Sequence, residues 1–121
     1  IRKEERKNEE EIKGVKFKIN NRKIYEDYER YEITIENKTD EDIIIDTKED
    51  TKSVFLTDKN GNKYNWYGHE IANENLRVKP NKTTKLSIKF NKVYNPKKTD
   101  KSIKFNDMII KGKNEKLEIN I

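Results

Sequence analysis

The sequence contains no cysteine, which excludes disulfide bonds and metal sites built on thiolates. Glycine occurs four times at scattered positions, so there is no glycine-rich loop that could hold a phosphate group. The single histidine, His69, would have to pair with a serine to form a nucleophilic triad. No serine lies in a Gly-x-Ser-x-Gly turn. We therefore expect a protein that is not an enzyme and that has no catalytic residues, metal or cofactor.

Long apolar runs are also missing. Hydrophobic residues make up 31% of the chain and charged residues 42%. No stretch approaches the roughly 18 apolar residues that a membrane-spanning helix needs. Because the chain begins at Ile1 rather than at methionine, we expect any secretion signal or lipid anchor to lie upstream of this sequence.

The apolar residues that are present alternate with polar ones, which is the period of a strand with one buried face. Residues 31–36 and 85–90 show this best, and Asn60-Gly61 between two apolar stretches predicts a hairpin. A turn is expected at 20–23. The strands that we expect lie at 15–19, 31–36, 43–45, 53–57, 63–67, 85–90, 103–105, 108–110 and 117–121.

Seven to nine short strands without a helical apolar period predict an all-β fold, an antiparallel β-sandwich. A closed barrel such as an OB-fold is the alternative. Residues 1–12 are almost all charged, so we expect a solvated tether or a frayed helix there, followed by one domain over 13–121.

Three stretches, 31–39, 54–64 and 76–90, together resemble a known family. The first is a strand ending in Asn37 before a polar turn, and the second is a Phe-Leu strand that turns at Asn-Gly. The third is a Pro80-Asn81 turn that opens a strand ending in Phe90; the family usually has glycine at the position of Asn81. The pattern resembles the DUF4352 or MPT63-like immunoglobulin-like domain of secreted proteins and surface lipoproteins of Gram-positive bacteria. This resemblance implies an immunoglobulin-like sandwich, an extracellular location at the cell surface, an upstream lipid anchor or signal, and no established enzymatic activity.

The candidate binding site is aromatic and consists of Tyr64, Trp66, Tyr67 and His69. On one strand, Tyr64 and Trp66 would share a face and Tyr67 would point to the opposite side. Such a platform could stack on a sugar ring or a peptide, so we expect an unidentified protein or a cell-wall glycan as the partner. The alternative is that Trp66 belongs to the core.

The charge pattern leaves other functions open. The net charge is +5, with 28 basic residues against 23 acidic ones, which indicates a mixed-sign surface. We expect no nucleic-acid binding, although an OB-like module for nucleic acid or another polyanion is the alternative function. A third possibility is an inhibitor that presents loop 91–101. Several carboxylates surround residues 43–45 without the spacing of a known calcium site, and we expect a solvated rim there. These carboxylates are Asp40, Glu41, Asp42, Asp46, Glu49 and Asp50.

Overall fold

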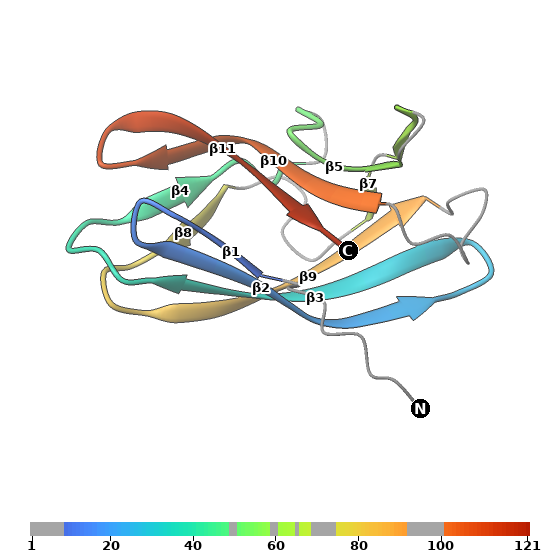
Figure 1. Cartoon of the computed structure of the whole chain (residues 1–121), viewed down its shortest axis with the longest axis horizontal. Coiled ribbons are helices and arrows are strands. Elements are labelled where there is room, and N and C mark those ends of the chain that lie inside the picture. The colour runs from blue at the N-terminus through green and yellow to red at the C-terminus, as the bar shows by residue number, and fades with distance from the viewer. Residues whose placement is uncertain (1–8, 49–50, 59–60, 65, 69–74, 92–100) are drawn as a thin grey trace.

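The computed structural model describes residues 9–48, 51–58, 61–64, 66–68, 75–91 and 101–121. These residues contain eleven β-strands in two antiparallel sheets that lie face to face (Figure 1). They include no helix, and therefore none that is long and apolar enough to cross a membrane. The predicted all-β antiparallel sandwich is confirmed, with eleven strands instead of seven to nine.

The first sheet has five strands in the order β1-β2-β3-β9-β7. Every neighbouring pair in it is antiparallel. Its strands are β1 (Glu9–Ile12), β2 (Val15–Ile24), β3 (Tyr28–Asn37), β9 (Thr83–Asn91) and β7 (Trp66–Gly68).

The second sheet is built around β10 (Lys101–Ile110). One edge of β10 pairs with β11 (Lys113–Asn120) along most of its length. Its other edge pairs with β5 (Val54–Asp58) in the first half and with β4 (Ile43–Ile45) in the second half. The sheet is completed by β6 (Lys63–Tyr64) beside β5 and β8 (Leu76–Val78) beside β4.

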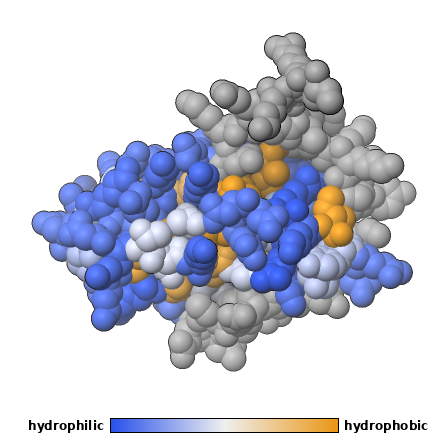
Figure 2. Space-filling model, turned by 90° about the horizontal axis from the view of Figure 1, so that it is seen from below, coloured by the Kyte–Doolittle hydropathy of each residue, from blue (hydrophilic) through white to orange (hydrophobic). Residues whose placement is uncertain are grey.

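The alternating apolar residues of both sheets meet in one core. Phe17 of the first sheet packs on Phe105 of the second, with ring centroids 5.1 Å apart. Tyr31 meets Phe90 edge-on within the first sheet. Seen from the side on which β2, β3 and β9 lie in Figure 1, the described surface is mostly hydrophilic (Figure 2). The alternation read from the sequence therefore separates a dry interior from a charged exterior.

Two expected breaks are absent because the strands continue through β-bulges. The turn predicted at 20–23 is wrong, because β2 runs on to Ile24 with a register shift between Ile19 and Asn21. Likewise, 103–105 and 108–110 belong to one strand, β10, with a shift between Phe105 and Met108. A bulge inserts an extra residue without ending the pairing, so the alternation changes phase where the strand does not stop.

The folded part begins earlier than the tether prediction placed it. Glu9–Ile12, expected in the tether, form β1 and pair with β2. The two strands are joined at Lys13 and Gly14, both with positive φ, as a two-residue hairpin turn requires. Ile12 packs against the core. The rest of the predicted tether, residues 1–8, lies outside the described residues.

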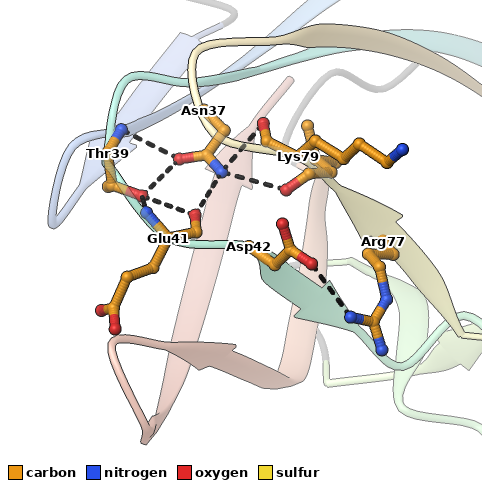
Figure 3. A network of polar contacts seen from close by, with 7 residues as sticks. Asn37, Thr39, Glu41, Asp42, Arg77 and Lys79 are labelled. Carbon is orange, nitrogen blue, oxygen red and sulfur yellow. Dashed lines mark hydrogen bonds and ion pairs between the residues drawn. The ribbon is translucent and has the colours of Figure 1, made fainter.

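The buried Asn37, at the end of β3, joins two connections of the sandwich (Figure 3). Its side-chain nitrogen lies 2.8, 3.0 and 3.2 Å from the carbonyl oxygens of Glu41, Val78 and Lys79. Its side-chain oxygen accepts hydrogen bonds from the backbone N–H and the hydroxyl of Thr39. The amide thus ties the β3–β4 loop to the β8–β9 turn, with all its polar atoms paired.

The neighbouring turns belong to the same hydrogen-bonded end of the sandwich. Lys38 donates its backbone N–H to the carbonyl of Gly14, in the β1–β2 turn. Asn81 has a φ of 56°, the left-handed conformation expected where asparagine replaces glycine. The sequence 37–39 matches a glycosylation acceptor pattern, but Asn37 is fully buried and serves the turn.

Replacing Asn37 with alanine should lower the free energy of unfolding by about 3 kcal/mol, because several buried backbone groups lose their partners at once. Chemical denaturation measures this change. The matched control is Asn114→Ala, at an exposed asparagine of β11, which should change stability by less than about 0.5 kcal/mol. Equal stabilities of the two variants would contradict the role given to Asn37.

Candidate functional site

The predicted aromatic site is divided between the two sheets. Lys63–Tyr64 form β6, which pairs with β5 in the second sheet, whereas Trp66–Gly68 form β7, which pairs with β9 in the first. The chain therefore passes from one sheet to the other within the stretch that we expected to be a single strand. The expectation for Tyr64 and Trp66 is wrong: they do not share one strand face, because they belong to different sheets.

Each predicted residue has a definite place in relation to this crossing. The Tyr64 ring is partly buried against the core, and its hydroxyl donates a 3.0 Å hydrogen bond to Asp58. Trp66 and Tyr67 lie on β7, at the end of the described strand order of the first sheet. His69 lies outside the described residues, and the aromatic platform stays a prediction.

The structure reveals a second cluster that the sequence reading missed, at the end of the sandwich where β3 begins. At its centre lies Glu29, whose side chain is fully buried. Its Oε1 accepts hydrogen bonds from Arg22 Nη2 at 2.8 Å, from Arg22 Nε at 3.2 Å and from the Tyr31 hydroxyl at 2.8 Å. One carboxylate oxygen is thus held by three donors from β2 and β3.

The opposite sheet contributes Lys101, at the start of β10. Its side chain is 2% exposed, and its Nζ lies 3.5 Å from the other oxygen of Glu29, Oε2. Among the residues that the structure describes, neither Oε2 nor Nζ has a hydrogen-bond partner. In the β5–β10 register Lys101 stands opposite Asp58, the residue that Tyr64 contacts. The charged cluster is thus connected to one member of the predicted aromatic site.

Burial changes the acid–base properties of these groups. Burial and the charge of Glu29 raise the pKa of Tyr31 well above its ordinary value. Burial lowers the pKa of Lys101; the charge of Glu29 opposes this effect, and the charge of Arg22 adds to it. The environment therefore favours a neutral phenol and weakens the hold of the Lys101 amine on its proton.

Part of this cluster could have been found in the sequence. The alternation of β3, extended back from Tyr31, places Glu29 on the inner face, and that of β10 places Lys101 there in the same way. Arg22 could not be found by this rule, because the bulge after Ile19 changes the phase of β2. The bulge brings Arg22 opposite Tyr31, with its guanidinium 5.8 Å from the centre of the ring.

Two of the carboxylates around β4, those of Asp42 and Asp46, contact neighbouring side chains. Asp42 pairs with Arg77 at 2.9 Å, as Figure 3 shows. Asp46 accepts hydrogen bonds from the hydroxyls of Thr51 and Ser53. The residues that the structure describes contain no group of three or more His, Cys, Asp or Glu side chains that could hold a metal ion. Glu49 and Asp50 lie outside them.

Comparison with known proteins gives relatives in structure only. No family model matches the sequence, and no curated protein matches it. The chain is similar to the yjhA protein from Bacillus subtilis, with a TM-score of 0.59 and 15% identity, covering 81% of this chain and 76% of that protein. It is also similar to an uncharacterized β-sandwich protein from Clostridium difficile, with a TM-score of 0.48 and 13% identity, covering 100% and 99% of the two chains. At 15% identity the first likeness shows a shared fold.

Replacing Tyr31 with phenylalanine should lower stability at pH 7 by about 2 kcal/mol, since Glu29 loses a donor to its buried charge. The pKa of Tyr31 is raised above 10.0 in the folded protein, so its contribution is complete below pH 10 and declines as the pH rises further. The difference between wild type and variant should therefore narrow above pH 10.

Denaturant titrations of both proteins from pH 7 to pH 11 measure this difference. The other five tyrosines are common to both proteins, so their own titration cancels in the comparison unless the substitution disturbs them. A difference that stays constant across this range would contradict the assignment.

Proposed function

We propose that this chain is a non-enzymatic binding or spacer module, displayed at the surface of a bacterial cell or secreted, of the DUF4352 or MPT63-like immunoglobulin-like type. The motif residues that carry this resemblance have defined structural roles in the sandwich. Asn37 joins the β3–β4 loop to the β8–β9 turn, and Asn81 takes the left-handed conformation in that turn. These roles support the resemblance without adding a reaction to it.

The observation that carries the proposal is the position of the ionisable cluster. Glu29 and Lys101 are sealed between the sheets, where a substrate from solution cannot reach them. The serines also have partners: Ser53 donates to Asp107, Ser87 accepts from Arg30, and Ser102 donates to Asn120. A module of this kind acts through its surface and shape.

Among the described strands, β7 has the best chemistry for a partner, and it lies at the end of the strand order of the first sheet. An edge strand offers unpaired backbone groups to an extended peptide, and aromatic residues are enriched where proteins bind partners. Trp66 and Tyr67 both lie on β7. We therefore place the contact with an unidentified protein or a cell-wall glycan on this edge.

The alternative, a polyanion-binding module, is disfavoured by the charges on the outer face of the first sheet. Lys16 stands opposite Glu36 across β2 and β3. Arg30 forms an ion pair with Glu32 at 3.4 Å. Opposite charges placed side by side weaken the field that would attract a phosphate backbone. Two separate sheets also differ from the closed barrel on which that function was expected.

Titration with solubilised peptidoglycan fragments should produce a saturable change in the fluorescence of Trp66, the single tryptophan. Tyr67→Ala should weaken this response at least tenfold, whereas Tyr25→Ala, at an exposed tyrosine beyond β2, should leave it unchanged. A flat response with both glycans and secreted host proteins would exclude the binding role and leave the spacer role. Binding that falls steeply with salt and extends to DNA would favour the polyanion alternative.

Surface display has its own test. Protease added to intact cells of the source organism should degrade the protein, while a cytosolic marker survives. Protection of the protein until the cells are lysed would contradict the proposed location.

A further inference from the structure

The pair formed by Glu29 and Lys101 has the geometry of two reactants. The carboxylate and the amine are both buried, and the two atoms that face each other, Oε2 and Nζ, lie 3.5 Å apart. In the described part of the chain, neither atom has a hydrogen-bond partner. Buried polar atoms normally find partners, so two unpaired atoms in the same place need an explanation. An ion pair alone offsets the desolvation of two charges only when further hydrogen bonds satisfy the charged atoms, and Oε2 and Nζ lack these among the described residues.

We propose that Glu29 and Lys101 condense to an intramolecular isopeptide bond that links the two sheets. The inference rests on the geometry of the cluster and is independent of the proposed surface role. It assigns a chemical step to residues that the binding module does not otherwise use.

The step balances without any co-reactant. A proton passes from the Lys101 ammonium to Oε2 of Glu29, which leaves a neutral amine and a carboxylic acid. The amine lone pair attacks Cδ of Glu29, and the C=O electron pair moves onto Oε1. A second proton then passes from nitrogen to Oε2, the C–Oε2 bond breaks, and one water leaves as the amide C=O re-forms.

Arg22 and Tyr31 are placed to assist this reaction. Negative charge would develop on Oε1, the oxygen that already accepts three hydrogen bonds from these two residues. Preorganised donors at 2.7–3.1 Å from such an oxygen are a main source of stabilisation in acyl transfer, and two of the three lie at 2.8 Å. Oε2, the leaving oxygen, is the one without donors.

The surroundings also weaken the hold of the Lys101 amine on its proton. In water, an amine and a carboxylic acid do not condense at neutral pH, chiefly because both are ionised. Burial penalises the ionised forms, and the lowered pKa of Lys101 agrees with this effect. Two groups held in contact by a folded chain also react without the entropy cost of meeting. Condensation removes two buried charges and releases water to the solvent.

Intact-mass spectrometry of the folded full chain tests the proposal. We expect a mass lower than that of the sequence by one water molecule, and a digest in which the peptide containing Glu29 is joined to the one containing Lys101. Protein kept in denaturant should retain its full mass, because unfolding separates the reactants. A wild-type protein that is folded by circular dichroism and keeps its full mass after prolonged incubation would overturn the proposal, whatever the variants do.

Two variants and a control identify the atoms involved. Lys101→Arg should keep the full mass, since the guanidinium is a poor nucleophile. Glu29→Gln should lose ammonia in place of water, because nitrogen now occupies the leaving position. Lys104→Arg, on the same strand but outside the cluster, should still lose water. A loss of water that persists in Lys101→Arg would also overturn the proposal.

Discussion

The period of two along β3 is the constraint on which both ends of the sandwich depend. It turns Glu29, Tyr31, Ile33, Ile35 and Asn37 toward the interior, and all five are fully buried. Burial of the isoleucines stabilises the fold, whereas burial of the polar residues at the two ends costs free energy unless these residues form hydrogen bonds or ion pairs. Asn37 finds them in the β3–β4 loop and the β8–β9 turn, and Glu29 finds them in β2 and β10. A single strand thus fixes the connections at one end and joins the sheets at the other.

Asn37 and Glu29, the buried polar residues at the two ends of β3, differ in how completely their polar atoms are paired. Asn37 is neutral, and both atoms of its amide group are hydrogen-bonded, so its burial is fully compensated. Among the described residues, one oxygen of Glu29 has three hydrogen-bond donors, and the other has the ion pair with Lys101 but no hydrogen bond. An incompletely paired buried charge is among the more costly arrangements in a protein, and replacing such a pair with apolar residues is often stabilising. The uneven pairing of the two oxygens therefore agrees better with the proposed condensation than with a role in stabilising the fold.

The sequence predicted those parts of the fold that rest on a constant period. The alternation from Tyr31 to Ile35 and the hairpin predicted from Asn-Gly required no knowledge of distant contacts. The structure contains the alternation in β3 and the pairing of β5 with β6. The bulge after Ile19 could not be read, because an inserted residue looks like a turn until the partner strand is known. The crossing between Tyr64 and Trp66 could not be read either, since two strands of different sheets can follow each other with hardly a break. In the charged cluster, the alternation of β3 could have predicted that Glu29 points inward, but the bulge in β2 concealed the same orientation of Arg22.

The proposed covalent link lies between the two sheets, where a β-sandwich has no backbone hydrogen bonds to prevent their separation. Within each sheet, hydrogen bonds between neighbouring strands resist separation, but β3 and β10 belong to different sheets and no ladder joins them (Figure 1). A sequence without cysteine has no disulfide to join the layers. A bond from Glu29 to Lys101 closes a loop of roughly 70 residues, for which the loss of chain entropy in the unfolded state corresponds to about 4 kcal/mol. A link at this position strengthens the contact between the two sheets, to which hydrogen-bond ladders contribute nothing.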